Sequence, residues 1–378
     1  MRFAKSLEEG ALKNVSTLKV RRVRARPVVV PMKLPLQTAT GAIGFAPLVL
    51  VDVETTAGIT GRSYLFAIGR HNLAPIVDLV LVLAMGEMLA GDAVAPFEIE
   101  KKLRAKYTLL GVHNIVLFAM SGIDVAAWDA LGQAMGQPVT RLLGGVPRAV
   151  RAYNSKGLGI MPLPKLVREA RQLVDEGFDA VKLRLGRPDA AGDLAAVRAV
   201  KKAIGPGVTL MCDFNQGLTV AEAIRRGHMI DDEGGMHWIE EPIRADDFEG
   251  CAKVADEVAT PIQVGENFMG PEQMAQALAA QCCDYVMPDL QRIGGVTGWM
   301  RAAALAQAAG IEMSSHLFHE VSAQLLPVTP TCHWLEYVDW ADPILEEPVA
   351  VKRGFVQPSE KPGLGMRWDE KAVKKYLA

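Results

Sequence analysis

Three acidic residues in the middle of the chain each end a short apolar run of strand-like composition. They are Asp213, Glu240 and Glu266, which are 27 and 26 residues apart along the sequence. Any one of them alone would be read as a solvated strand end. Three carboxylates in register repel one another unless a cation lies between them. An all-oxygen set that leaves positions open suits Mg²⁺, with Mn²⁺ as a possible substitute. The three residues therefore predict a divalent metal site, with Asn215, Glu241 and Asn267 as candidate outer partners of its ligands and Asn215 also as a substrate-binding residue.

A second pair of residues, Asp289 and His316, has the composition of a general base. Asp289 ends the strand-like run that follows the run of Glu266, and His316 ends the next run along the chain. A carboxylate beside an imidazole fixes its tautomer and raises its basicity. An isolated histidine is more often structural. The position of His316 at the end of a strand, like the three acids, favours a catalytic role.

Two cations and a further acid complete the candidate site. Lys182 and Arg184 alternate with apolar residues, so that both side chains lie on one face of a strand. They could hold a substrate carboxylate, although an internal salt-bridged pair would show the same pattern. Glu336 ends a later strand and could act as an acid, and Ser155 could bind a carboxylate oxygen.

These groups together fit the removal of a proton next to a carboxylate. That proton is very weakly acidic, and its loss gives an enediolate with charge on two oxygens. Mg²⁺, Lys182 and a protonated Glu336 could stabilise this charge, and His316 could accept the proton. The sequence thus predicts an enzyme that acts on a small 2-hydroxy carboxylate.

The elements that must position these residues are repeating strand–helix units. From Arg184 to Glu336 the candidate residues follow one another at intervals of 29, 27, 26, 23, 27 and 20 residues, counted along the sequence. Serial βα units of this length predict a parallel sheet closed into a TIM-type barrel, with the strand ends meeting at one mouth. We expect an α+β domain over residues 1–145 (with 1–17 as an arm), the barrel over 146–348 and a C-terminal segment over 349–378 that packs back on the first domain.

The composition excludes several classes of partner. The net charge is −2 and half of the residues are hydrophobic, which gives no reason to expect nucleic acid or an anionic membrane as partner. Apolar runs are shorter than the roughly 20 residues of a membrane span. The first residues, up to Lys19, do not resemble a secretion signal. Five scattered cysteines indicate reduced thiols, so we expect a cytoplasmic protein.

At these residues the sequence resembles the enolase superfamily, mandelate racemase subgroup, which includes muconate lactonizing enzymes. The resemblance runs from about Leu18 to the C-terminus. Its motifs are Val181-Lys182-Leu183-Arg184, Asp213-Phe214-Asn215-Gln216, Trp238-Ile239-Glu240-Glu241-Pro242, Gly265-Glu266-Asn267, Met287-Pro288-Asp289, Ser314-Ser315-His316-Leu317-Phe318 and His333-Trp334-Leu335-Glu336.

The resemblance implies a capping α+β domain on a modified (β/α)7β barrel. It implies one Mg²⁺ held by Asp213, Glu240 and Glu266, and a His316–Asp289 dyad beside the substrate. It also implies that Lys182 touches the substrate carboxylate, that Glu336 is the electrophilic partner, and that the protein forms a homo-oligomer, possibly an octamer.

Arg184 departs from the racemase pattern. Racemases of the family have a Lys-x-Lys motif whose second lysine is the base opposite the histidine, and here that place is taken by Arg184. A guanidinium is a poor proton acceptor at neutral pH. This favours a dehydratase of acid sugars that uses His316 as its single base.

The segment Gly41–Phe45 favours a racemase or epimerase instead. In the family it forms a lid over the distal part of the substrate, and Ile43 and Phe45 would give that lid an apolar surface, with Tyr64 as a nearby polar group. A racemase or epimerase of a mandelate-like acid is therefore ranked slightly above the dehydratase. The third hypothesis, a barrel that binds a metal-chelated acid without turnover, is disfavoured because a pure binder needs no base.

Overall fold

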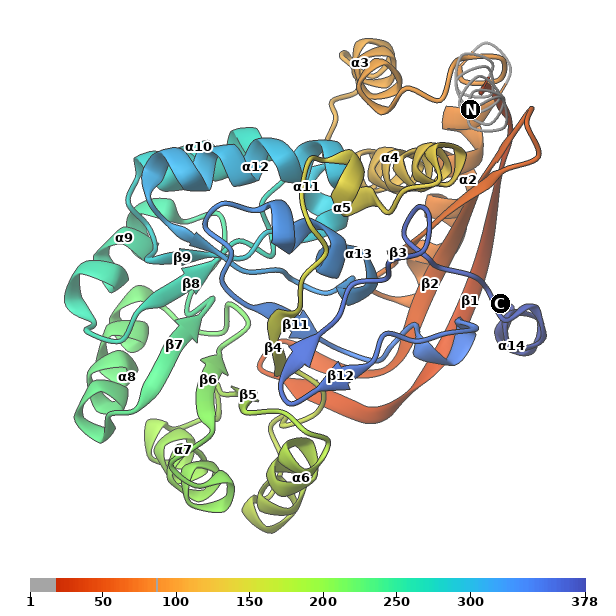
Figure 1. Ribbon diagram of the computed structural model, residues 1–378. Coiled ribbons are helices and arrows are strands. Elements are labelled where there is room, and N and C mark those ends of the chain that lie inside the picture. Colours follow the sequence, from red (N-terminus) through yellow and green to blue (C-terminus); the bar gives the residue numbers. More distant parts are fainter. Residues whose placement is uncertain (1–17, 86–87) are drawn as a thin grey trace.

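The computed structural model describes residues 18–85 and 88–378, so the arm expected over residues 1–17 lies outside the described residues. An N-terminal sheet with its helices lies beside a barrel of parallel strands surrounded by helices (Figure 1). This is the capping domain and (β/α) barrel that the sequence predicts.

The N-terminal domain is a three-stranded antiparallel sheet covered on one face by helices. The sheet has the order β1-β2-β3. The longest helix, α4, has the length and apolar composition of a membrane span, but 89% of its most apolar stretch is buried inside the protein. It is therefore the central core helix of this domain. The elements are β1 (Val20–Thr38), β2 (Gly41–Thr55), β3 (Thr60–Phe66), η1 (Arg70–Asn72), α2 (Leu73–Ala84), α3 (Pro96–Lys106), α4 (Asn114–Met135) and α5 (Val139–Leu142).

The segment Gly41–Phe45, expected to form a lid, begins the second strand of the β1–β2 hairpin. Strand pairing continues to Thr38 opposite Gly41, with Leu36 opposite Ile43. The turn is therefore only two residues long. Pairing can reach this far because Gly41 adopts a φ of 153°, which residues with a side chain rarely adopt, and the residues after it are compatible with a strand.

Within the described residues, the barrel is made of strands β4 to β11, all of them parallel. Neighbouring strands follow the order of the chain from β4 to β10, and β11 pairs with β4. A bridge between Met313 and Cys332 links β10 to the segment that leads into β11, and so closes the barrel. The strands are β4 (Val150–Asn154), β5 (Ala180–Arg184), β6 (Thr209–Asp213), β7 (Met236–Glu240), β8 (Ile262–Val264), β9 (Tyr285–Val286), β10 (Glu312–Met313) and β11 (Leu335–Tyr337).

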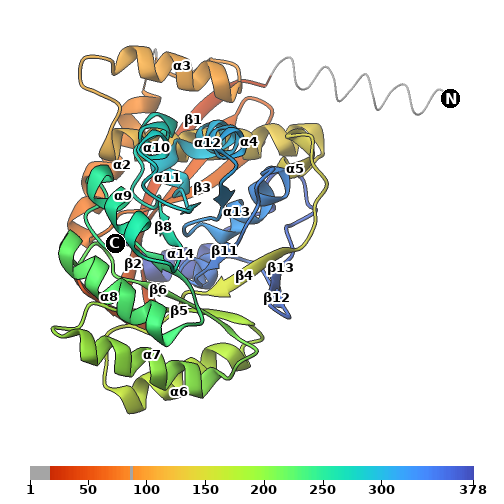
Figure 2. The same cartoon turned by 90° about the vertical axis from the view of Figure 1, so that its left-hand side faces the viewer.

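A helix follows each of the strands β4 to β10 and covers the outside of the barrel (Figure 2). The first of them, α6, buries Leu166, Ala170 and Leu173, which are three to four residues apart and therefore share one face. The helices are α6 (Leu163–Asp175), α7 (Ala190–Ile204), α8 (Val220–Glu233), α9 (Phe248–Glu257), α10 (Pro271–Ala279), α11 (Leu290–Ile293), α12 (Gly295–Ala309), α13 (His319–Leu325) and η2 (Leu326–Val328).

The C-terminal segment returns to the N-terminal domain, as the sequence predicts. Trp368 donates its indole N–H to Asp52 in β2 at 2.7 Å, and Glu370 pairs with Arg26 in β1 at 2.7 Å. Figure 1 shows the last helix beside β1. The elements of this segment are η3 (Asp342–Ile344), β12 (Val351–Lys352), β13 (Phe355–Val356) and α14 (Glu370–Tyr376).

The backbone is strained where several barrel strands end. Asn215, Glu241 and Leu317 have positive φ angles of 45°, 37° and 49°. Each lies one or two residues after a candidate catalytic or metal-binding side chain. Non-glycine residues in this conformation cost free energy and are concentrated at functional sites. The strain therefore marks this mouth of the barrel as the site.

Candidate active site

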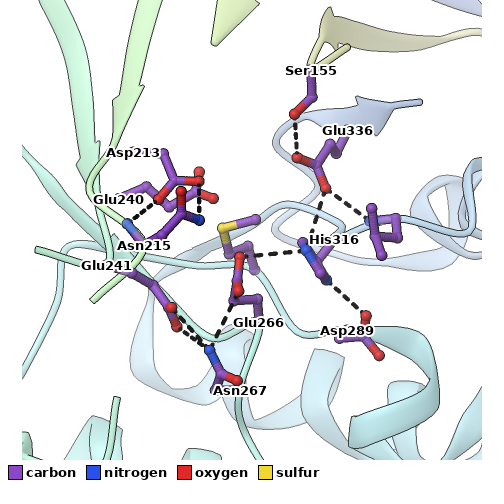
Figure 3. Close-up of polar contacts among 12 residues, drawn as sticks. Ser155, Asp213, Asn215, Glu240, Glu241, Glu266, Asn267, Asp289, His316 and Glu336 are labelled. Atoms are coloured by element: carbon purple, nitrogen blue, oxygen red, sulfur yellow. Dashed lines mark hydrogen bonds and ion pairs between the residues drawn. The ribbon is translucent and has the colours of Figure 1, made fainter. Parts of the chain in front are cut away.

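The three acids predicted to bind metal lie together at the mouth of the barrel. Asp213 and Glu240 end β6 and β7, and Glu266 follows β8. One carboxylate oxygen of each lies within 4.8 Å of the other two. Asp213 and Glu240 are buried, whereas Glu266 is partly exposed. Figure 3 shows all three on neighbouring strands.

The crowding of these carboxylates is visible in the pKa of Glu240. Burial raises it to about 8, and the charges of Asp213, Glu336 and Glu266 add to the increase although Lys182 opposes it. A bound cation removes such a penalty. Asn215 donates to both oxygens of Asp213, and its own buried side-chain oxygen lacks a hydrogen-bond partner among the described residues. This all-oxygen donor set fits Mg²⁺.

A second group of side chains holds the partly exposed Glu266. Asn267 donates its amide N–H to both oxygens of Glu241 at 2.8 and 2.9 Å. Arg292 donates to the side-chain oxygen of Asn267 and to the backbone carbonyl of Glu266. Glu241 and Asn267 thus lie where the sequence suggests outer partners of the metal ligands. Arg292, in contrast, was missed, although it follows Asp289 closely in the sequence.

Lys182 is enclosed by carboxylates on the floor of the site. Its ammonium lies 2.5 Å from Glu240, 2.8 Å from Glu336 and 3.4 Å from Asp213. Burial alone would lower the pKa of Lys182, but the three carboxylates more than offset it and raise the pKa above its ordinary value. Lys182 is therefore a fixed positive charge and not a proton acceptor.

His316 and Asp289 form the predicted dyad. The Nδ1 atom of His316 lies 2.7 Å from Asp289, which also accepts the backbone N–H groups of Gln291 and Arg292. The opposite nitrogen, Nε2, lies 3.4 Å from Glu266. Burial would lower the pKa of His316, but Glu266, Glu336 and Asp289 together raise it to about 9. The imidazole is therefore oriented and strongly basic.

The surroundings of Glu336 favour its ionised form. Burial would raise its pKa, but Lys182, His316 and the hydroxyl of Ser155 lower it below the ordinary value. Its other oxygen accepts the backbone N–H of Leu317 at 2.9 Å. This differs from the protonated acid that the sequence suggests, because Lys182 donates directly to Glu336 here.

Arg184 directs its guanidinium at the backbone of the loop after β4. Its Nη1 atom donates to the carbonyls of Ser155 and Gly157 at 2.6 and 2.9 Å, and its Nη2 atom donates to the Ser155 hydroxyl at 2.8 Å. That hydroxyl donates to Glu336 at 2.6 Å. Ser155 is completely buried. Both residues therefore position Glu336, and the structure gives Ser155 no direct place against the substrate.

A pocket of about 250 Å³ opens above these residues. Its polar floor is lined by Lys182, Arg184, Asp213, Asn215, Glu266, Asn267, Asp289, His316 and Glu336. Its other walls combine apolar and polar side chains. Several of these were not predicted from the sequence, because they come from segments that are distant along the chain. These are Leu36, Thr38, Thr40, Ile43, Phe66, Ile68, Gln216, Gln291, Arg292, Leu317 and Trp340.

The predicted lid residues are placed differently from one another. Ile43 lines the pocket, as expected. Phe45 instead lines a neighbouring hollow, is 46% exposed and lies under the guanidinium of Arg70. Tyr64 is buried, donates to Glu320 at 2.6 Å and packs on Phe318. Ile43 lines the neighbouring hollow as well as the pocket, and it shares one face of β2 with Phe45 because side chains two residues apart point the same way, so position along the strand separates the two.

Comparison with known proteins identifies both domains. Residues 20–144 match the mandelate racemase / muconate lactonizing enzyme N-terminal domain, and residues 165–372 match the enolase C-terminal domain-like family. A curated relative, the L-talarate/galactarate dehydratase of Salmonella typhimurium, is 32% identical over 265 residues, which cover 70% of this chain and 66% of that protein.

Two solved structures are similar over nearly the whole chain. An enolase from an alpha proteobacterium, BAL199, with bound Mg²⁺ is 45% identical with a TM-score of 0.93, and covers 96% of this chain and 100% of its own. An enolase from Bradyrhizobium, complexed with magnesium and mandelic acid, is 46% identical with a TM-score of 0.91, over 96% of this chain and 99% of its own. Together with the domain matches, these similarities establish that the chain belongs to the enolase superfamily of enzymes.

Proposed function

We propose that this protein removes the α-proton of a 2-hydroxy carboxylate in a Mg²⁺-dependent reaction with His316 as its single base, and that the reaction is the dehydration of an acid sugar. The observation that carries the choice of reaction is the arrangement of Arg184. Its guanidinium donates to two backbone carbonyls and one hydroxyl. It therefore acts as a clamp for the loop after β4, which leaves one base at the site.

The pocket walls support a polyhydroxy substrate. Thr38, Thr40 and Gln216 bring hydroxyl and amide groups into the pocket, and Phe45 lies outside it. The lid is thus less apolar than its sequence suggests. The Salmonella relative is named as a dehydratase of sugar acids, which agrees with this assignment.

The reaction begins with proton transfer to Nε2 of His316. Asp289 would hold the N–H at Nδ1, and a cation on Glu266 would offset the largest charge that raises the pKa of His316, which would leave Nε2 free to accept the proton. The electrons of the broken C–H bond pass into the carboxylate and give the enediolate. Asp213, Glu240 and Glu266 would hold Mg²⁺, which would supply positive charge for the enediolate oxygens. Lys182 provides a second fixed charge.

Loss of the β-hydroxyl completes the reaction. The enediolate electrons form a C=C bond as the C–O bond to the β-hydroxyl breaks, and the imidazolium of His316 returns its proton to the leaving oxygen, which departs as water. The resulting enol becomes a 2-keto-3-deoxy acid. Because one group both accepts and returns the proton, the mechanism needs no second base.

A racemase or epimerase is the second candidate. The Bradyrhizobium structure contains mandelic acid, and Leu36, Ile43 and Phe66 give one side of the pocket an apolar surface. The two reactions differ in what happens to the two enantiomers and in whether a keto acid appears.

The deciding measurement is proton NMR in D₂O with Mg²⁺, on separate enantiomers of mandelate-like acids and on a set of acid sugars, with semicarbazide detection of keto products. We expect one stereochemical series of an acid sugar to be consumed with formation of a 2-keto-3-deoxy acid. Exchange of the α-proton in both enantiomers of one acid, without keto product, would establish a racemase. A complete lack of exchange and product in every acid tested would contradict both candidates.

A further inference from the structure

A second group of possible metal ligands lies outside the catalytic pocket. It consists of His319 and Glu320 in the first turn of α13 and Asp342 in η3. One ligand atom of each residue lies within 4.8 Å of the other two. His319 and Glu320 are 1% and 3% exposed, so that the group lies in the interior of the protein.

The ligand atoms of this group lack hydrogen-bond partners within the described part of the chain. These atoms are both ring nitrogens of His319, Oε1 of Glu320 and Oδ1 of Asp342, and all are buried. Buried polar atoms without partners are rare in folded proteins, because each loses its contact with water and gains nothing in return. Four such atoms in one cluster point to a ligand between them.

The remaining oxygens of the two carboxylates are held by tyrosines. Tyr64 donates to Oε2 of Glu320 at 2.6 Å, and Tyr337 donates to Oδ2 of Asp342 at 3.3 Å. Each carboxylate is thus oriented through one oxygen while the other stays free. Metal-binding carboxylates are commonly oriented in this way by outer hydrogen bonds.

The spacing of the group suits a metal better than direct hydrogen bonds. The Nδ1 atom of His319 lies 3.6 Å from Oε2 of Glu320, and its Nε2 atom lies 3.6 Å from Oδ1 of Asp342. An N–H···O hydrogen bond spans about 2.7–3.2 Å. Two ligands bound tetrahedrally to one ion at about 2.1 Å lie about 3.4 Å apart. One ion can bind only one ring nitrogen of His319, together with one oxygen of each carboxylate, and such a set of three atoms lies within 4.8 Å of one another.

We propose that His319, Glu320 and Asp342 form a second metal site, which binds a divalent transition metal of the Zn²⁺ type. The imidazole ligand distinguishes it from the all-oxygen site of Asp213, Glu240 and Glu266, because nitrogen ligands favour zinc over magnesium.

The site has a route to solvent and a structural consequence. Glu320 also lines a hollow of about 170 Å³ together with Glu347, Ser359 and Leu364. An ion bound there would tie the start of α13 to η3. The start of α13 lies three residues after His316, and η3 follows the pocket residue Trp340. The metal would thus fix two walls of the catalytic pocket relative to each other.

The direct test is crystallography of the wild-type protein with Zn²⁺ in the presence of excess Mg²⁺. We expect an anomalous zinc peak about 2.0–2.2 Å from His319, Glu320 and Asp342. Density that shows only an imidazolium between two carboxylates, with no anomalous peak there, would overturn the proposal. This measurement needs no variant and does not depend on the catalytic assignment.

Calorimetric titration with Zn²⁺, again in excess Mg²⁺, tests the same site in solution. We expect His319→Gln to weaken the binding of one zinc equivalent at least tenfold. The matched control His228→Gln removes an exposed histidine and should bind zinc as the wild type does. Glu240→Gln should also retain this equivalent, whereas its loss there would assign the zinc to the catalytic carboxylates and refute a second site.

Discussion

The imidazole of His316 has one nitrogen fixed by Asp289 and the other directed toward the pocket. This asymmetry makes it a base with a defined direction of attack. Lys182 and Arg184 come from the same strand face, yet their surroundings separate their roles. Carboxylates hold Lys182 as a charge, whereas backbone carbonyls hold Arg184 as a clamp.

Replacement of His316 by Asn should abolish α-proton exchange while Mg²⁺ binding and folding persist. An amide cannot accept the proton, and a positioned general base contributes roughly 10²- to 10⁴-fold to a rate. NMR exchange rates and Mg²⁺ titration measure the two properties separately. Retention of more than about a tenth of the wild-type exchange rate would remove His316 from the mechanism.

Removal of the Lys182 ammonium should make stability depend more strongly on Mg²⁺. In Lys182→Met, Asp213, Glu240 and Glu336 lose their shared cation, and loss of one partner of a buried ion pair costs about 3–5 kcal/mol. Thermal unfolding in EDTA should therefore occur at a lower temperature than in the wild type, and Mg²⁺ should raise it more.

The control for this prediction is Lys201→Met, because Lys201 pairs with Glu233 in a more exposed position. This substitution should lower the free energy of unfolding by less than about 1 kcal/mol, and Mg²⁺ should raise the unfolding temperature as much as in the wild type. An equal Mg²⁺ response in the Lys182 variant and the wild type would show that Lys182 and the metal do not share the same carboxylates.

At the scale of elements, the β1–β2 hairpin contributes to the pocket through one face of its strands. Thr38 and Ile43 lie in the pocket wall, whereas Phe45 contacts Arg70 in the neighbouring hollow. Ile43 and Phe45 share one face of β2, so position along the strand sorts these side chains into substrate contact and surface.

This sorting predicts different effects for two truncations of the hairpin. Ile43→Ala should raise KM about tenfold, because the removed part of a buried aliphatic side chain contributes about 1–2 kcal/mol. Its matched control, Phe45→Ala, should change KM less than about twofold. Steady-state kinetics on the identified substrate compares them, and an equal or larger effect of Phe45→Ala would place Phe45 in the substrate pocket.

At the scale of the whole molecule, α4 of the capping domain is joined to the barrel through Asp124. Its carboxylate accepts the backbone N–H and the hydroxyl of Thr297 in the first turn of α12. Burial raises the pKa of Asp124 to about 7, although the bonds from Thr297 oppose the increase. The folded protein therefore binds this proton more tightly than the unfolded chain does.

The sign of the resulting pH dependence follows from this shift. The contribution of Asp124 to stability is complete below the ordinary pKa of 3.8 and is lost as the pH rises through about 7. Between pH 5 and 8 the free energy of unfolding of the wild type should therefore fall by on the order of 2 kcal/mol relative to that of Asp124→Asn. Urea unfolding of both proteins at the two pH values measures the difference, and a difference that stays constant would show that Asp124 does not titrate in this range.

The sequence by itself determined the barrel and the composition of its mouth. The regular intervals between Asp213, Glu240, Glu266, Asp289 and His316 reflect repeating βα units, and parallel strands bring their ends to one side. Residue type then indicated a metal site and a base. The barrel is confirmed and these side chains meet at its mouth, because strand periodicity is a local property of the chain; the roles of metal ligand and base stay predictions.

Only the tertiary structure decided what each side chain contacts. The attachment of Arg184 to the loop after β4, the turn of Tyr64 toward Glu320, and the meeting of His319 with Asp342 join segments that are distant along the chain. Such contacts depend on packing between elements, where each side chain takes whichever buried partner satisfies its charge and hydrogen bonds. Sequence spacing carries no record of that choice.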